Sequence, residues 1–432
     1  TTMTEAGISN TLKTMLMSNL IPYIMPKGFP VPEVMSGVGK VNELGQLCKT
    51  LGCMNILVVS DGMLSKLGIV KKCTDGLAQS NVKFTVFDKV VPNCPDRLIM
   101  MGYNLYKHSK CDGIIAVGGG SSMDCAKVIG AKVANPSEPI ESFIGSFKVS
   151  GRDPKREAKF PPFIAIPTTA GTGSETTVVA VVHFEERGLK EVITDPVFVP
   201  KYAVLDANLT LSLPKFVTAT TGMDALTHAT ESYLSTMGTE RTKNYALKAV
   251  EEIGKHLLTC YREPSNTEAR GKMLQASFDA GVAFTNSSVG YVHAIAHTLG
   301  AFFGTPHGAA NAMILPLVLD FYLDKCIDQY CDLAIAIGIT NELPTSAEDK
   351  FKLAKAYVAK IREMNEFMQI PTFVKEMTVD DVDRVVTRSM VEAHGSGKIF
   401  DMSDAGYPVP KYMKRADVTK IVNTFVSNVS KM

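Results

Sequence analysis

Short β-branched runs alternate with amphipathic or polar stretches between about residues 54 and 205. Apolar runs that read as buried strands occupy residues 56–60, 83–87, 113–117 and 163–166. Helical patterns follow the first run to about residue 79 and fill residues 95–108. Strands separated by helices at this spacing indicate βαβ units and a mostly parallel, Rossmann-like sheet. Residues 176–184 and 190–194, separated by a charged turn at Gly188, predict a hairpin.

The pattern becomes helical from Thr218 onward, and β-branched runs almost disappear. Helices are predicted at residues 224–234, 243–261, 268–284, 307–323, 347–367, 380–394 and 416–427. We therefore predict an α/β domain over residues 1–210 and an all-helical domain over residues 211–432. The polar stretch 145–159 is interpreted as a surface loop.

Composition and charge exclude several classes of protein. The chain has 432 residues, 45% of them hydrophobic and 21% charged, which is typical of a packed protein rather than a disordered one. Forty-five basic and 44 acidic residues give a net charge of +1 without a basic stripe, so nucleic-acid binding is not expected.

Nine scattered cysteines without a CxxC pair favour a reduced, cytoplasmic compartment. The most apolar N-terminal segment, residues 15–25, is too short for a membrane span and lacks the basic flank of a secretory signal. Because the sequence begins with Thr1 rather than Met, it is consistent with a native N-terminus further upstream.

Two small-residue loops follow predicted strands. Residues 118–127 begin with three glycines and open a helix, where free N–H groups favour an anion such as pyrophosphate. The alternative is a tight turn with Ser121 as the helix cap, and the spacing is not GxGxxG. Residues 167–176 form the second loop, rich in hydroxyls. Asp61, after the first predicted strand, could bind an adenosine ribose and repel a 2′-phosphate, or simply cap a helix.

Histidines gather in the helical half, three of the eight lying within residues 293–307. His293 and His297 are four residues apart and so share one helix face, as do Asp224 and His228. With His307, these side chains suit Fe(II), Zn(II) or Mn(II), and the absence of thiolates argues against structural zinc. The alternative is a helix-capping Asp with ordinary hydrogen-bonded histidines, but such groups among apolar helices are costly unless paired.

The motifs together make the chain resemble the iron-containing (group III) alcohol dehydrogenases. The resemblance rests on residues 118–121 with Asp124 and Lys127, and on residues 167–175, 224–228, 293–297 and 306–308. It extends from about residue 30 to 370 and implies the two-domain architecture shared with dehydroquinate synthase. The tail departs from the family, since residues 406–412 replace a common Asn-Pro-Arg motif.

The resemblance also implies roles for particular residues. A metal, Fe(II) or a replacing Zn(II), would be bound by Asp224, His228, His293 and His307. His297 would line the reaction site, and Phe284 the substrate pocket. NAD, rather than NADP, would be held by Asp61, Asn93, Gly119, Gly120, Ser121, Thr168, Thr169 and Lys190.

The activity implied is hydride transfer between a short-chain primary alcohol or aldehyde and NAD(H). A hydroxyacid–oxoacid transhydrogenase is an alternative, and a sugar-phosphate cyclase is a more distant one because no basic cluster accompanies the histidines. We also expect a homo-oligomer, with no nucleic-acid or membrane partner.

Overall fold

The computed structural model describes residues 28–151, 153–395 and 406–426. The chain divides into two compact units, one comprising Phe29–Ser212 and the other comprising Leu213 onward together with Gly28. The two units are described separately below. The apolar segment 15–25 lies outside the described residues.

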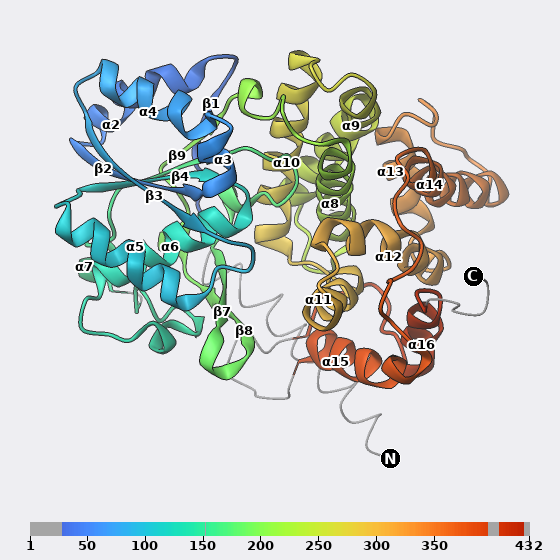
Figure 1. The fold of residues 1–432 in the computed structure, drawn as a ribbon. Coiled ribbons are helices and arrows are strands. Elements are labelled where there is room, and N and C mark those ends of the chain that lie inside the picture. Colours follow the sequence, from blue (N-terminus) through green and yellow to red (C-terminus); the bar gives the residue numbers. More distant parts are fainter. Residues whose placement is uncertain (1–27, 152, 396–405, 427–432) are drawn as a thin grey trace. The chain divides into compact units, whose positions relative to one another are not determined.

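A six-stranded parallel sheet forms the centre of the first unit (Figure 1). Its strands, in spatial order, are β1 (Glu33–Ser36), β9 (Tyr202–Leu205), β6 (Phe163–Pro167), β4 (Gly113–Gly118), β2 (Asn55–Asp61) and β3 (Lys83–Val90). Because all neighbouring strands are parallel, their carboxyl ends lie at one edge of the sheet.

Alternate residues of the central strands belong to two different cores. Ile56 and Val58 of β2 face α2 (Leu44–Thr50) and α4 (Ile69–Gln79), whereas Leu57 and Val59 face α5 (Asp96–His108) and α6 (Gly120–Ala134). Figure 1 shows the two pairs of helices on opposite faces of the sheet. Burial on both faces explains why these strands read as continuous apolar runs.

The predicted hairpin is confirmed, although its first strand begins later than expected. It consists of β7 (Val179–Phe184) and β8 (Leu189–Thr194), with Gly188 at φ 60° in the turn. Residues Ser174–Thr176 form a 3-10 turn instead of strand. The stretch interpreted as a surface loop contains β5 (Gly145–Ser146), which pairs with β8, and α7 (Pro154–Glu157), so that interpretation was wrong in detail.

The buried side chain of Lys127, in α6, forms hydrogen bonds with the hairpin and with the second small-residue loop (residues 167–176). Lys127 Nζ donates to Ser174 O at 2.8 Å, Thr177 Oγ1 at 2.7 Å and Val179 O at 2.8 Å. Burial lowers the pKa of Lys127 to about 8, although the nearby carboxylates of Asp124 and Glu175 act in the opposite direction and raise it. These hydrogen bonds therefore satisfy backbone groups that water cannot reach.

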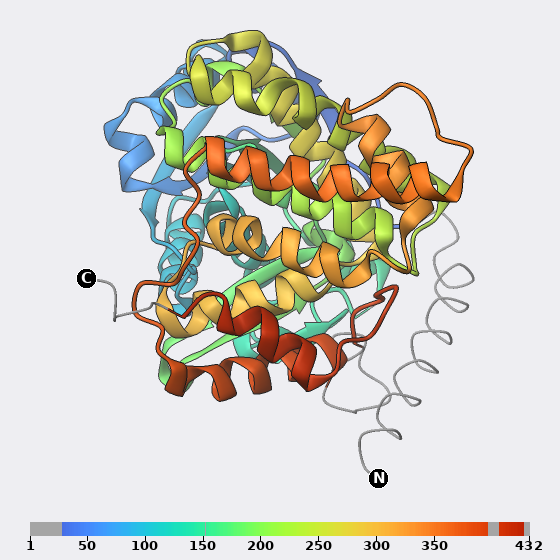
Figure 2. The ribbon, with the colours of Figure 1, turned by 90° about the vertical axis from the view of Figure 1, so that its right-hand side faces the viewer.

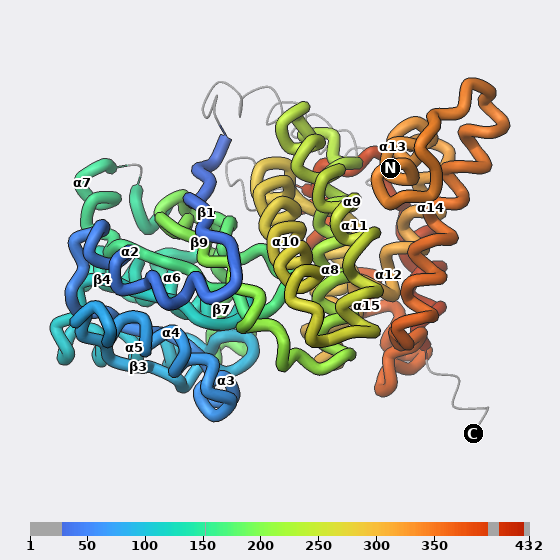
Figure 3. Tube along the Cα trace, turned by 90° about the horizontal axis from the view of Figure 1, so that it is seen from above, coloured from blue at the N-terminus to red at the C-terminus, as the bar shows by residue number. Residues whose placement is uncertain are grey.

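The second unit is helical, and α8 is its most buried helix. Helices α9 and α10 pack against α8, and Figure 3 shows the three running alongside one another. Helix α12 also packs on α8, while α11 packs on α12 and α15 (Figure 2). The helices are α8 (Lys215–Leu234), α9 (Glu240–Arg262), α10 (Thr267–Ser287), α11 (Tyr291–Phe303), α12 (His307–Tyr322), α13 (Ile327–Ala336), α14 (Ala347–Phe367), α15 (Val382–His394) and α16 (Arg415–Asn423).

The predicted α/β half and helical half are confirmed. Helix α14 has the bounds predicted, whereas α8 begins nine residues before residue 224 and ends at Leu234 as expected. The short edge strand β1 and helix α13 were not predicted. The helix predicted at 416–427 ends at Asn423, and residue 427 lies outside the described residues. None of the nine cysteines is disulfide-bonded. Within the described ranges, every helix is too short or too polar to span a bilayer.

Replacing Lys127 by Met should lower the free energy of unfolding by about 3 kcal/mol, because several buried oxygens would lose their donor. Chemical denaturation followed by circular dichroism measures this change. Lys107→Met, on the exposed face of α5, is the control and should stay within about 0.5 kcal/mol of the unmodified chain. Equal stability of the two variants would contradict the role given to Lys127.

Candidate metal centre

Helix α8 carries the first two members of the predicted metal site. Asp224 and His228 are one turn apart, and both are buried, with exposed fractions of 2% and 4%. Every residue of α8 from Gly222 to Leu234 is buried, so this part of the helix is enclosed by the rest of the protein. His228 Nε2 lies 4.0 Å from Asp224 Oδ1.

The N-termini of α11 and α12 supply the other two members. His293 lies in the first turn of α11, and His307 is the first residue of α12. The next residue, Gly308, makes this approach possible, because a Cβ there would lie 2.3 Å from the Thr220 carbonyl oxygen of α8. A larger residue would push α12, and with it His307, away from α8.

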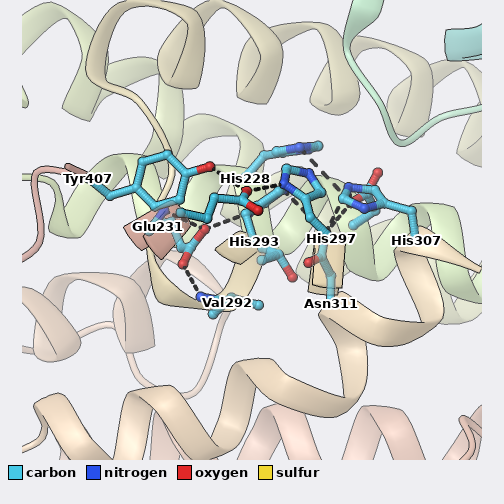
Figure 4. Close-up of polar contacts among 12 residues, drawn as sticks. His228, Glu231, Val292, His293, His297, His307, Asn311 and Tyr407 are labelled. Carbon is cyan, nitrogen blue, oxygen red and sulfur yellow. Dashed lines mark hydrogen bonds and ion pairs between the residues drawn. The ribbon is translucent and has the colours of Figure 1, made fainter. Parts of the chain in front are cut away.

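The four side chains converge on one point, as Figure 4 shows for the histidines. One potential ligand atom from each of Asp224, His228, His293 and His307 lies within 4.8 Å of all the others. His307 Nε2 is 3.4 Å from Asp224 Oδ1. The amide Nδ2 of Asn311 lies among them, 2.7 Å from Asp224 Oδ1 and 3.2 Å from His293 Nε2.

This donor set fits a divalent transition metal. One carboxylate and three imidazoles match the ligand preferences of Fe(II) and Zn(II), and a single protein carboxylate leaves net positive charge on the site. Burial, followed by the charges of the neighbouring histidines, holds the pKa of His293 well below its usual range. His293 is therefore neutral, which is the form that binds a metal.

Glu231, which was not predicted, fixes the orientation of His293. Its Oε2 accepts hydrogen bonds from His293 Nδ1 at 2.6 Å and from Gly290 N at 2.9 Å, and its Oε1 accepts one from Val292 N at 2.8 Å (Figure 4). The same carboxylate thus caps α11 and directs His293 Nε2 toward the donor set. Burial raises the pKa of Glu231 to about 7, although these hydrogen bonds lower it.

Two further predicted residues lie beside the donor set. The ring of Phe284, on α10, stacks on His228 with centroids 4.2 Å apart. His297, one turn after His293, stacks on His307 with centroids 5.1 Å apart. His297 Nδ1 is 2.5 Å from Glu392 Oε1, and Tyr407 donates to the same oxygen at 2.9 Å. Burial alone would raise the pKa of Glu392, but the charge of His297 and these hydrogen bonds together lower it.

In the α/β unit, five of the remaining predicted residues lie at or just after the carboxyl ends of adjacent strands. Asp61 closes β2, Gly119 and Gly120 follow β4, and Thr168 and Thr169 follow β6. Gly119 and Gly120 lie beside the second loop, since Cβ atoms added to them would be in ordinary contact, at 3.4 Å, with Thr169 Oγ1 and Thr172 Cγ2.

The sequence left two residues on this edge, Ser121 and Asp61, as possible helix caps, and the structure decides between the alternatives. Ser121 is not a helix cap, because α6 already begins at Gly120 and Gly119 stands at the cap without a side chain to bond. Asp61 does cap a helix, since its Oδ1 accepts from Met63 N and Leu64 N at the start of α3 (Gly62–Lys66). Both of these hydrogen bonds go to Oδ1, so the cap of α3 does not use Asp61 Oδ2.

Asn93 and Lys190 lie further along the same unit. Asn93 has φ 69° in the exposed turn between β3 and α5. Lys190, exposed in β8, pairs in register with His183, and His183 N donates to Cys94 O at 3.2 Å. The hairpin therefore connects the two residues.

Glu231, Asn311 and Glu392 were missed, although the sequence holds a signal for the first two. Glu231 stands three residues after His228, and Asn311 four residues after His307, so each shares a helix face with a metal-binding candidate. A polar residue on an otherwise apolar face needs a buried partner. Glu392 is far from the histidines in sequence and only the packing of α15 on α11 brings it near.

Glu231→Gln should weaken metal binding about 10- to 100-fold. Both carboxylate oxygens of Glu231 accept hydrogen bonds, and in glutamine one of them is replaced by an NH2 group, which would face a donor instead of accepting from it. Titration of metal-stripped protein with Zn(II) against a competing chelator measures the affinity. Glu252→Gln, beside His256 on α9, is the matched control and should leave the affinity unchanged. Undiminished affinity in Glu231→Gln would show that His293 is oriented by other contacts.

Comparison with known proteins agrees with this site. The family model "Iron-containing alcohol dehydrogenase" matches residues 31–207, and its C-terminal counterpart matches residues 218–424. The NAD-dependent methanol dehydrogenase of Bacillus methanolicus is 32% identical over 360 residues, which cover 83% of this chain and 91% of that protein.

Two further relatives carry 1,3-propanediol in their names. The 1,3-propanediol dehydrogenase of Citrobacter freundii is 35% identical over 356 residues, covering 82% of this chain and 89% of that protein. A solved 1,3-propanediol oxidoreductase superposes with a TM-score of 0.83 at 30% identity, covering 91% and 98% of the two chains. The chain therefore belongs to the iron-containing alcohol dehydrogenase family and is an NAD-dependent oxidoreductase of that family.

Proposed function

We propose that the enzyme interconverts short-chain primary alcohols and aldehydes, with NAD as the hydride carrier. In the oxidative direction a primary alcohol and NAD+ give an aldehyde, NADH and a proton. The observation that carries the proposal is the convergence of Asp224, His228, His293 and His307 on one point in the helical unit. Asp224, His228 and His293 are buried and His307 is partly exposed, and burying such polar groups is costly unless they are paired or bind a metal.

These four residues would hold Fe(II), or Zn(II) in its place, and the ion would supply Lewis-acid polarisation of the alcohol or carbonyl oxygen. The residues around the ligands set its environment. Glu231 keeps His293 in the correct tautomer, and Asn311 donates to Asp224 Oδ1. Phe284, stacked on His228, would form an apolar wall for the substrate carbon chain.

The carboxyl edge of the sheet would hold the dinucleotide. Gly119, Gly120 and Ser121, at the start of α6, and Thr168 and Thr169 would bind the pyrophosphate through backbone N–H groups and hydroxyls. Asp61 would accept hydrogen bonds from the adenosine ribose. Asn93 and Lys190 would make further contacts with the cofactor.

The names of the relatives support a small substrate. Methanol and 1,3-propanediol are short primary alcohols, and the chain matches both enzymes over more than four fifths of its length. We therefore propose alcohols of a few carbons with a primary hydroxyl.

Chelation of the bound metal should abolish oxidation of NADH by propionaldehyde, and Fe(II) or Zn(II) should restore it. The loss of NADH absorbance measures the rate, and metal analysis of the same sample verifies the depletion. Asp224→Ala should contain no bound metal and should not recover, whereas the surface variant His108→Ala should behave as the unmodified enzyme. Full activity in verified metal-free protein would refute the proposal.

The same assay separates the dehydrogenase from a transhydrogenase. A dehydrogenase consumes free NADH in proportion to the aldehyde reduced. A transhydrogenase would instead reduce an oxoacid with a hydroxyacid while the free NADH concentration stays constant. Turnover of that kind without net NADH consumption would replace the proposed activity.

Asp61→Ser should raise the ratio of kcat/KM for NADPH to that for NADH at least about tenfold, equivalent to about 1.4 kcal/mol of relieved repulsion. Serine keeps a hydroxyl that can cap α3 and removes the negative charge. Asp153→Ser, which alters the cap of α7 in the same unit, is the matched control. An unchanged ratio would mean that the adenosine end is recognised elsewhere.

A further inference from the structure

Two charged side chains of α6 contact both the second small-residue loop and the hairpin. Asp124 Oδ1 accepts a hydrogen bond from Ser174 Oγ at 3.2 Å, and its Oδ2 accepts one from Val181 N at 3.1 Å. Lys127, three residues further along α6, donates to Ser174 O and to Val179 O, each at 2.8 Å. One carboxylate and one ammonium group thus each connect α6 to the loop and to β7.

Ser174 is the residue of the loop on which both charged groups act. Lys127 Nζ also lies 3.2 Å from Ser174 Oγ, so the hydroxyl lies between the ammonium group and the carboxylate. Because an ammonium group can only donate and a carboxylate can only accept, the hydroxyl accepts from Lys127 and donates to Asp124. Ser174 is 5% exposed. Its hydroxyl is therefore used to hold the loop in place.

The start of the second loop is held in a different way. Thr168 N donates to Gly118 O at 3.1 Å, which continues the pairing of β6 with β4 past the end of the strand. Further along the loop, Thr172 Oγ1 accepts from Ser174 N at 3.3 Å. The loop is therefore attached at its start to β4 and at its end to α6, the two elements between which Gly119 lies.

These contacts link three segments to which the proposed function assigns cofactor contacts. Gly119 lies at the start of α6, Thr168 lies in the second loop, and Lys190 lies in the hairpin. Two residues of β7 form hydrogen bonds with α6, and β8, which carries Lys190, pairs with β7 along its whole length. The loss of either charged side chain would therefore change how all three segments are held relative to one another.

We propose that Asp124 and Lys127 are positioning residues of the dinucleotide site, which hold the second loop and the hairpin where they can bind the pyrophosphate of NAD. The inference rests on the proposed function, from which it takes the residues that contact the cofactor. Lys127 is buried, and its hydrogen bonds go to the protein, so it acts through the loop. We therefore expect its loss to weaken binding of the phosphates, but not of the adenosine that Asp61 would bind at the end of β2.

Binding of NADH to the Zn(II)-loaded enzyme, followed by the fluorescence of the reduced nicotinamide, tests this inference. Lys127→Met and Asp124→Asn should each raise the Kd for NADH about tenfold, as expected for the loss of one buried hydrogen bond. Ser174→Ala should raise it about threefold, because the bond from Lys127 to the backbone remains. In competition with NADH, ADP should lose affinity by the same factors, whereas adenosine, which has no phosphate, should bind as it does to the unmodified enzyme.

Lys132→Met is the matched control for the loss of a buried lysine. Lys132 lies on the same helix, is 7% exposed and donates to two backbone carbonyl groups beyond the far end of α6. This variant should be destabilised to a similar extent as Lys127→Met, yet keep the Kd for NADH and for ADP. Thr74→Ala, which removes a buried hydroxyl of α4, is the control for Ser174→Ala. If Lys127→Met does not fold, Asp124→Asn and Ser174→Ala complete the test.

Steady-state kinetics provide a second readout, which a general loss of stability would not reproduce. The KM for NAD should rise about tenfold in Lys127→Met and in Asp124→Asn, while kcat at saturating NAD, the KM for the alcohol and the metal content stay unchanged. Because both side chains act on the same loop, the double variant should lose less affinity than the product of the two single losses.

The outcomes distinguish this inference from the proposed function. If the enzyme binds NADH but oxidises no alcohol, the proposed function fails while the Kd values still test the inference. If the enzyme oxidises alcohols and the α6 variants keep the Kd of the unmodified enzyme, only the inference is refuted. Equal losses of affinity for ADP and adenosine, equal effects of Lys132→Met and Lys127→Met on ADP binding, or multiplicative losses in the double variant would also refute it.

Discussion

Helices α8 and α11 are joined at the carboxylate of Glu231, and the donor set depends on that junction. The carboxylate satisfies two backbone N–H groups at the start of α11, which would otherwise be buried without partners, and it also holds the ring of His293. Gly290 leaves room for it, since a Cβ there would lie 2.8 Å from Glu231 Oε1. One side chain therefore sets both where α11 begins and which nitrogen of His293 faces Asp224.

The helices that carry the donor set are otherwise held together by ordinary apolar packing. Gly308 brings α12 onto the backbone of α8, so that His307 meets Asp224. Four polar groups in such surroundings carry a desolvation cost that the packing must support. A bound cation would offset that cost, so we expect the enzyme to be more stable with metal than without it.

Much of this could be predicted from the sequence, because the period of the apolar residues and the i, i+4 pairs are local properties. The spacing of Asp224 and His228, and of His293 and His297, predicted that each pair shares a helix face. Of these four residues and His307, all but His297 form the donor set. The contact of Glu392 with His297 could not be predicted, because it depends on the packing of α15 against α11. Strand β1 was missed for a different reason: it is short and largely exposed, so it lacks the apolar run of a central strand.

The pairing of the β7–β8 hairpin with the turn before α5 has a consequence for cofactor exchange. Pro95 forms a parallel bridge with His183, and His183 lies opposite Lys190 in the hairpin. If Asn93 and Lys190 both contact the dinucleotide, neither can withdraw without disturbing the backbone hydrogen bonds that link them. The two residues would then approach and leave the cofactor together.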